Sequence, residues 1–137
     1  MNPIIRNILA VIAGIIAGGT ANMLIIMISG SVIPLPEGVD TSTTEGFKAA
    51  LPLLSAKHFI MPFLAHALGS FVGALVAALL AVSHKMKFAL GLGALTMVGG
   101  IVAAFILPAP AWFIALDLIA AYIPTAYIAG IIAGARK

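Results

Sequence analysis

Long apolar stretches, separated by short polar connections, dominate the pattern of this chain. Four of them, at about residues 8–28, 58–83, 88–107 and 111–133, contain almost no charged side chain. Each supplies about 20 helical residues at about 1.5 Å per residue, the length needed to cross a hydrocarbon core about 30 Å thick. The pattern therefore predicts an all-α membrane protein, a four transmembrane helix bundle that forms a single domain over residues 1–137.

The composition narrows the class further. Hydrophobic residues make up 63% of the chain and charged residues only 8%, whereas about 25% of the residues in a soluble domain are charged. The first apolar stretch is longer than the core of a signal peptide, so we expect it to be retained as a span. No cysteine is present, which excludes disulfides, thiolate metal sites and iron–sulfur clusters. We predict no cofactor and no metal site.

The positions of the basic residues predict the orientation in the membrane. Two of the seven lie in the long loop after the first span, together with three of the four acidic residues. The other five lie before span one, between spans two and three, or after span four, and they are Arg6, Lys85, Lys87, Arg136 and Lys137. By the positive-inside rule, both termini are then cytoplasmic. We expect a multi-pass protein of the bacterial inner membrane with the lipid bilayer as its surroundings, and no nucleic-acid partner.

The two outer connections differ in length. The longer one, at about residues 30–57, contains Ser42 and Glu45 at the spacing of a capping box, followed by apolar residues such as Phe47 at helical spacing. This predicts one short amphipathic helix in the outer loop, acting either as an interfacial linker, which we favour, or as a lid. The shorter connection, Pro108-Ala109-Pro110, predicts that spans three and four are antiparallel neighbours.

Each span carries one polar residue near its middle: Asn22, His66, Thr96 and Asp117. At about 1.5 Å per residue, Asn22 and Asp117 lie about 9 Å inside the outer boundary and His66 about 12 Å, while Thr96 lies nearer the midplane. At 100° per residue, every one of them shares its face with small residues, and such faces pack against neighbouring helices rather than lipid. We therefore predict one layer of Asn22, His66 and Asp117 inside the bundle, with Thr96 below it.

Glycines at four-residue spacing mark two of these faces, Gly14 with Gly18 and Gly69 with Gly73. Glycine lets helix backbones approach closely, so both pairs are predicted to lie in helix interfaces.

Asp117 is the residue that most requires an explanation. An unpaired carboxylate at this depth costs about 3 kcal/mol even on lenient insertion scales, and no lysine or arginine lies within any span. His66 is the obvious partner, with Asn22, Tyr122 and Thr125 as further hydrogen-bond donors. Such a couple can relay a proton or cation, since histidine titrates near neutrality, or it can simply clamp two helices together. Pro124, in the same span, predicts a kink beside the acid.

His58 is a further candidate at the outer end of span two. It lies about 12 Å along the helix from His66 and roughly 80° around it, so the two cannot share one metal ion within a single chain. Together with Met23, Met27 and Met61 it suggests a soft copper path, although methionine is also ordinary filler in apolar helices, which we favour.

One resemblance rests on the run His-Phe-Ile-Met-Pro-Phe-Leu-Ala-His-Ala-Leu-Gly-Ser-Phe-Val-Gly at residues 58–73, on Pro-Ala-Pro-Ala-Trp-Phe at 108–113 and on Asp117-Leu118. In these residues the chain resembles a set of uncharacterised small bacterial four-helix integral membrane proteins. The resemblance covers most of the chain and implies the same fold, but it carries no activity. The small multidrug exporters have a similar size but use a glutamate in their first span, which is absent here.

Three functions are compatible with these residues. The leading one is the binding or conduction of a small ion or solute, with proton coupling as an option, by an oligomeric protein. The alternative is a structural or accessory subunit of a larger membrane complex, and the third is an acid–base membrane enzyme acting on lipid or quinone, which we favour least. The candidate binding residues are Asp117, His66, Asn22, Thr96, His58 and Tyr122, and no catalytic residue is predicted.

Overall fold

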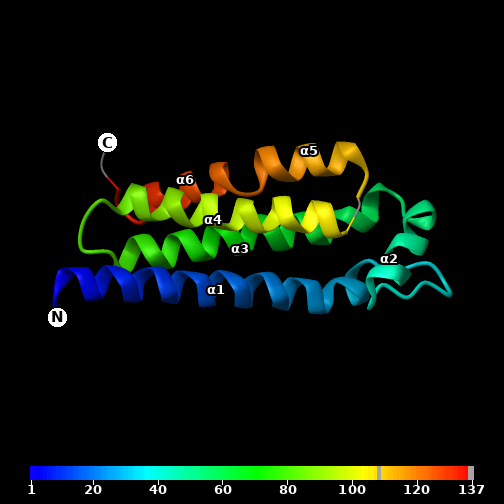
Figure 1. Cartoon of the computed structure of the whole chain (residues 1–137), viewed down its shortest axis with the longest axis horizontal. Coiled ribbons are helices and arrows are strands. Elements are labelled where there is room, and N and C mark those ends of the chain that lie inside the picture. The colour runs from blue at the N-terminus through cyan, green and yellow to red at the C-terminus, as the bar shows by residue number, and fades with distance from the viewer. Residues whose placement is uncertain (108, 136–137) are drawn as a thin grey trace.

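The computed structural model describes residues 1–107 and 109–135, and the elements found there are helical. The long helices are α1 (Pro3–Val32), α3 (Ile60–Leu80) and α4 (Lys85–Ile106), followed by the shorter α5 (Ala111–Ala120) and α6 (Ile123–Ile132). They lie side by side as an elongated bundle (Figure 1). Four helical segments in the described residues are long and apolar enough to cross a membrane, the fourth made of α5 and α6 together. The predicted all-helical bundle is confirmed, with these four helical segments long and apolar enough to cross a membrane.

The helix boundaries depart from the predicted spans at several ends. Helix α1 has 30 residues because it begins at Pro3, directly after Asn2, whose side-chain oxygen accepts a hydrogen bond from the Ile4 N–H. The second span ends at Leu80 rather than at residue 83. The chain has to reverse there, and His84 turns it with a left-handed φ of 54° immediately before α4.

Helix α1 packs almost entirely on α3, through the glycines that the sequence places at four-residue spacing. A Cβ atom at Gly14 would lie 2.7 Å from the Gly73 carbonyl oxygen, and one at Gly18 would lie 2.6 Å from the Gly69 carbonyl oxygen. Only residues without a side chain allow the two backbones to approach so closely. The predicted placement of both glycine pairs in a helix interface is confirmed.

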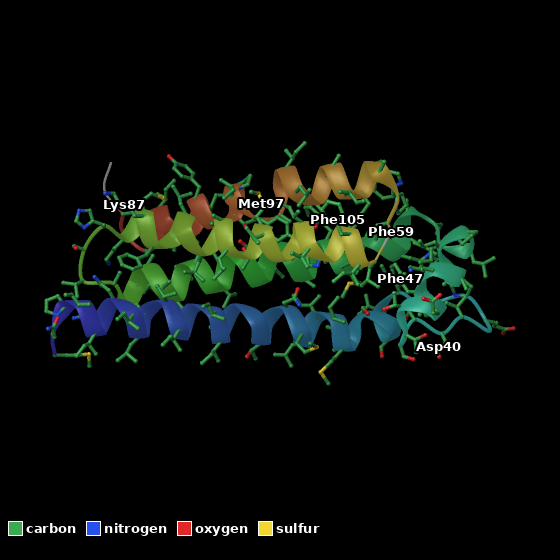
Figure 2. The ribbon with its side chains drawn as sticks, in the orientation of Figure 1. Asp40, Phe47, Phe59, Lys87, Met97 and Phe105 are labelled. Atoms are coloured by element: carbon green, nitrogen blue, oxygen red, sulfur yellow. The ribbon has the colours of Figure 1, made fainter. Side chains whose placement is uncertain are left out.

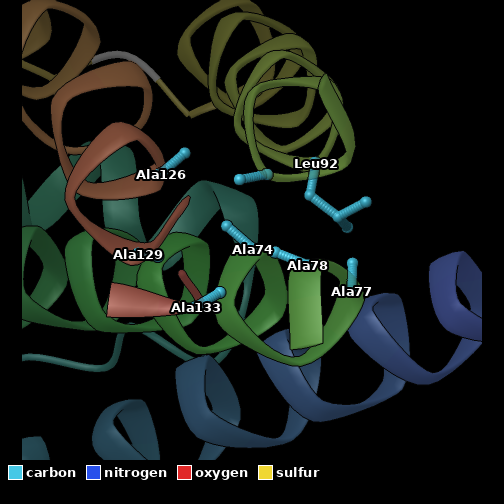
Figure 3. Packing of buried hydrophobic residues seen from close by; sticks show 8 residues of the cluster. Ala74, Ala77, Ala78, Leu92, Ala126, Ala129 and Ala133 are labelled. Atoms are coloured by element: carbon cyan, nitrogen blue, oxygen red, sulfur yellow. The ribbon is translucent and has the colours of Figure 1, made fainter. Parts of the chain in front are cut away.

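Helix α3 is central, because it also packs on α4 and α6. We call the end of the bundle at which α1 begins and α6 ends the base (Figure 1). Towards the base, α3, α4 and α6 meet in a core made almost entirely of alanine (Figure 3). Small side chains let the three helices pack closely, so a buried apolar core lies in this half of the bundle. Its buried members are Ala74, Ala77, Ala78, Ala89, Leu92, Ala126, Ala129 and Ala133.

Basic side chains bind helix ends at the base. The Arg6 Nε–H donates to the Leu80 carbonyl oxygen at 3.0 Å, and Lys85 Nζ donates to the Ala133 carbonyl oxygen at 2.9 Å. Cations suit these positions because the carbonyls at a helix C-terminus lack backbone partners. Arg136 and Lys137, which complete the predicted basic side, lie outside the described residues, as does Pro108 of the predicted Pro108–Pro110 connection.

The opposite, loop end is covered by residues 33–59. It holds the short helix α2 (Thr44–Ala50) and two turns of 3-10 helix, η1 (Leu51–Leu53) and η2 (Ala56–Phe59). The predicted short helix is present, but its cap is Thr43 and not the predicted Ser42. Thr43 Oγ1 accepts the Gly46 N–H at 3.0 Å, whereas the Ser42 N–H donates to Asp40 Oδ1 at 2.8 Å. Hydrogen bonds from the Ser42 hydroxyl and N–H hold the pKa of the exposed Asp40 carboxyl below its usual value.

The fourth span is broken rather than only kinked. Helix α5 ends at Ala120 and α6 begins at Ile123, so that Pro124 falls in the first turn of α6. Proline is tolerated there because its missing N–H would have no helical partner in a first turn. The break, at Ala121 and Tyr122, lies four to five residues beyond the buried Asp117.

Candidate functional site

Asp117 and His66 form a hydrogen-bonded pair inside the bundle. Asp117, on α5, is only 5% exposed, and His66, on α3, donates from Nδ1 to both carboxylate oxygens at 2.9 Å. A carboxylate only accepts, so Nδ1 carries the hydrogen of this bond. The hydrogen bond predicted between these two residues is present, and it joins spans two and four.

Tyr122 completes the pair, and the helix break is what brings it there. Its hydroxyl donates to Asp117 Oδ2 at 2.9 Å, although the two residues are five apart in sequence. On an unbroken helix, five residues at 100° each would leave them about 140° apart, on nearly opposite faces. The break between α5 and α6 turns Tyr122 back towards Asp117. The helix break therefore places the Tyr122 hydroxyl against the Asp117 carboxylate.

The Tyr122 ring is held between two neighbours. It stacks on the His66 ring, with centroids 5.8 Å apart and an interplanar angle of 26°. On α4 it lies against Gly100, where a Cβ atom would overlap the phenol. Glycine at residue 100 is required for this arrangement, and the aromatic stack fixes the orientation of the imidazole that Asp117 binds.

Two hydroxyls continue the polar network one turn towards the base. Thr96 Oγ1 donates to Ser70 Oγ at 3.1 Å, and Ser70 Oγ donates to the Tyr122 carbonyl oxygen, also at 3.1 Å. Thr125 Oγ1 donates to the Ala121 carbonyl oxygen at 2.7 Å, so a side chain bonds one of the carbonyls at the break. Thr96 lies below the pair, as predicted. Ser70 was missed in the sequence, although it is the polar residue four positions, about one helical turn, after His66.

A cavity of about 340 Å³ opens above the pair at the loop end. Phe47 and Leu54 of the loop line it together with Phe59 and Phe113, and Figure 2 shows Phe47 and Phe59 at this end of the bundle. Most of the other lining residues are aliphatic, and His66 and Asp117 also line it. A mostly apolar space of this size with a few polar groups is typical of a small-molecule site.

A second cavity, of about 320 Å³, lies between α1, α3 and α4 and shares His66, Gly100 and Ala103 with the first. Asn22 and Thr96 line it. Asn22 also packs on Gly69, where a Cβ atom would lie 2.9 Å from the Asn22 Cβ. Among the described residues, no side-chain hydrogen bond joins Asn22 to His66 or Asp117. Asn22 is thus beside the pair across a cavity, and not bonded to it.

The second ring nitrogen of His66 is accessible. Within the described residues no side-chain nitrogen or oxygen is both fully buried and without a hydrogen-bond partner. His66 Nε2 has no partner there, since the bonds of this ring are made by Nδ1. Nε2 therefore has accessible surface, and its ring lines both cavities, whereas Asp117 is engaged by His66 and Tyr122.

His58 lines the first cavity, but its ring bonds to the loop and not to Asp117. Its Nδ1 accepts the Ser55 N–H at 3.0 Å, and its Nε2 lies 3.2 Å from the Pro34 carbonyl oxygen. An amide N–H only donates and a carbonyl only accepts, so the neutral ring with hydrogen on Nε2 satisfies both. His58 thereby fastens the start of the loop to its end, above the cavity.

The residues proposed for a copper path are not brought together. Met61 lines the first cavity, but Met23 and Met27 are 55% and 71% exposed and line neither cavity. Among residues 1–107 and 109–135, no three His, Asp or Glu side chains are grouped closely enough to hold a metal ion.

Comparison with protein-family models, with curated proteins and with solved structures finds no match to this chain. Chemically, the pair presents an imidazole whose Nδ1–H is held by a carboxylate and whose Nε2 can accept or release a proton towards a cavity, the orientation that makes histidine effective in proton transfer.

Proposed function

We propose that this protein binds a small solute or ion in the cavity at the loop end and moves it across the membrane in a proton-linked cycle. The observation that carries the proposal is the position of the Asp117–His66 pair at the wall of a cavity of about 340 Å³, with Nε2 accessible. A carboxylate and an imidazole serving only as a helix clamp would need no space beside them. Proton-relaying acids and histidines of membrane proteins characteristically face such cavities.

The difference between the two halves of the bundle supports transport by a protein that is open at one end. The loop-end half contains the two cavities that meet at His66, while the half towards the base contains the buried alanine core. A helix broken beside an acidic residue is a common way for transporters to build a site that opens to one side at a time. The break between α5 and α6 is the element at which the half towards the base would open.

The charge pattern sets the orientation within this proposal. With Arg6, Lys85 and Lys87 at the base, the base is cytoplasmic and the cavity faces the outside of a bacterial inner membrane. We further propose a homo-oligomer or a subunit of a membrane complex. A Cβ atom added at Gly91 of α4 would meet nothing within 4 Å, and such a bare helix surface allows a neighbouring helix to approach.

The accessory-subunit alternative requires a dry, fully bonded interior throughout. The half towards the base has a buried alanine core, but the loop-end half has two cavities and a ring nitrogen without a partner among the described residues. An acid–base enzyme would use the same Nε2 as its base. It ranks third because the described lining provides no nucleophile hydrogen-bonded to that nitrogen.

The test is a flux assay in proteoliposomes that enclose a pH-sensitive dye. A pH gradient is imposed and three probes are added separately outside: potassium ion, 2-phenylethylammonium and 3-phenylpropionate. We expect at least one to change the internal pH faster than in vesicles without protein, and Asp117→Asn to remove that difference. Glu37→Gln, the same carboxyl-to-amide change at an exposed loop position, is the control that keeps the flux.

Two results would contradict the proposal. If no probe changes the rate beyond that of protein-free vesicles, the protein does not transport these classes of solute and the accessory role gains support. If Asp117→Asn conducts as well as the parent, the pair is only a structural clamp.

A further inference from the structure

The cavity above Asp117 has a charge balance that selects among possible ligands. Among its described lining residues the titratable side chains are Asp117, His66 and His58, and none is lysine or arginine. Asp117 is therefore balanced either by a proton on His66 or by a positive charge that a ligand brings. An anionic ligand would have to leave water beside a buried carboxylate with no fixed cation to receive it.

The position of the hydrogen on the His66 ring determines which ring nitrogen can bind a ligand. Asp117 holds the hydrogen on Nδ1, so in the neutral ring the accessible Nε2 carries a lone pair and accepts a hydrogen bond. A group that donates N–H and carries positive charge satisfies Nε2 and balances Asp117 at once. A neutral hydroxyl can donate a hydrogen bond to Nε2 but does not balance the charge of Asp117. A quaternary ammonium balances that charge but has no N–H to donate to Nε2.

The walls of the cavity suit the rest of such a molecule. Phe47, Phe59 and Phe113 line it, and the Phe59 and Phe113 rings lie 5.0 Å apart between centroids. Ring faces attract organic cations, most strongly where water is excluded. The aliphatic remainder of the lining takes an apolar substituent, and about 340 Å³ accommodates a small organic ligand.

Resting on the proposed function, we infer that the ligand is a small lipophilic ammonium ion with at least one N–H, and that it exchanges for the proton on His66. In the proton-loaded state, the charges are an imidazolium and the Asp117 carboxylate. On binding, the proton leaves Nε2 for the outer water, the ammonium N–H donates to the freed lone pair, and no covalent bond changes in the ligand. The net charge of the site is the same before and after, so the buried carboxylate is never left unbalanced.

The experiment compares three probes of one shape by calorimetry on the purified protein in nanodiscs. They are 2-phenylethylammonium, the neutral 2-phenylethanol and the anionic 3-phenylpropionate, each corrected by titration into empty nanodiscs. We expect the ammonium to bind at least about tenfold more tightly than the alcohol, and the carboxylate to bind weakest. Repeating the titration in buffers of different ionisation enthalpy should show one proton released for each ammonium bound, at a pH at which the pair is protonated.

The dependence on pH and on the two histidines is specific. Where the pair is protonated, the ammonium affinity should fall about tenfold for each unit of decreasing pH, because one proton competes for one position. His66→Gln should abolish both the proton release and this dependence. His84→Asn, which removes a histidine before α4 that lines neither cavity, should keep both. These readouts separate a binding role of His66 from a purely structural one.

The outcomes distinguish the ligand class from the proposed function. If the alcohol or the carboxylate binds as tightly as the ammonium, or if His66→Gln keeps the proton release, the inference is wrong while a flux dependent on Asp117 would still support transport. If none of the three probes binds, the class is overturned, and the flux of potassium ion decides the proposed function separately.

Discussion

Replacing Gly18 by alanine tests the tightest contact of the bundle. The Cβ atom that this change adds would lie 2.6 Å from the carbonyl oxygen of Gly69 on α3. Ordinary contact begins at 3.4 Å, so the two helices must separate by about 0.8 Å at this point. The obstacle is backbone on both sides, and no side-chain rotation relieves it.

The size of the effect follows from a matched neighbour. Gly19 is the next residue on the same helix, and a Cβ atom there meets nothing within 4 Å. Both changes improve helix propensity by about the same amount, close to 1 kcal/mol in water, so their difference isolates the packing. Overpacking a close interface costs about 1–3 kcal/mol. Gly18→Ala should therefore be less stable than Gly19→Ala by that amount.

Reversible unfolding in mixed micelles, titrated with a denaturing detergent and followed by circular dichroism, measures both free energies of unfolding. The single tryptophan, Trp112, gives a second and local signal. Equal stability of the two variants would show that α1 does not pack on α3 through Gly18, and the second cavity, which Gly18 lines beside His66, would then have a different shape.

Two further predictions concern the site and the loop. Tyr122→Phe removes the hydroxyl that donates to Asp117 but keeps the ring on His66, so it should lower the free energy of unfolding by about 1.5–3 kcal/mol, as expected for a hydrogen bond to a charged group. Tyr127→Phe, at a half-exposed position, should leave the free energy of unfolding unchanged. Equal values for the two variants would contradict the role of the Tyr122 hydroxyl. The His58 ring accepts the Ser55 N–H and lies 3.2 Å from the Pro34 carbonyl oxygen. At one fixed pH, His58→Ala should therefore accelerate the hydrogen exchange of residues 33–59 relative to the parent. An unchanged exchange rate would show that His58 does not fasten the loop.

Much of the architecture was predictable because membrane spans are a local property. A hydrocarbon core demands an unbroken run of apolar residues and internally satisfied backbone groups, so the four spans and their helical state can be recognised without knowledge of any contact. The interface of Gly14 and Gly18 with Gly69 and Gly73 was also predictable. Small residues at four-residue spacing line one helix face and gain nothing from lipid.

The candidate site was predictable only in part. A carboxylate inside a span needs a partner, and with no lysine or arginine available the pairing of Asp117 with His66 followed by elimination. The roles of Asn22 and His58 did not follow in the same way. Depth and helix face place Asn22 near His66, yet whether its amide bonds to the pair or faces a cavity depends on the distance between α1 and α4. The bonds of His58 to both ends of the loop depend on a chain path that two prolines and a short helix make irregular.

The sequence alone therefore determined the membrane spans, the glycine interface and the need for a partner at Asp117, since each follows from the solvent that surrounds a single helix. Only the tertiary structure decided the extent of the break at Ala121 and Tyr122, the return of the Tyr122 hydroxyl to Asp117 and the cavities that meet at His66. These features depend on how three or four helices meet. A phenol can reach an acid five residues away only if the helix stops between them, and a cavity exists only where the neighbouring side chains fail to fill the space.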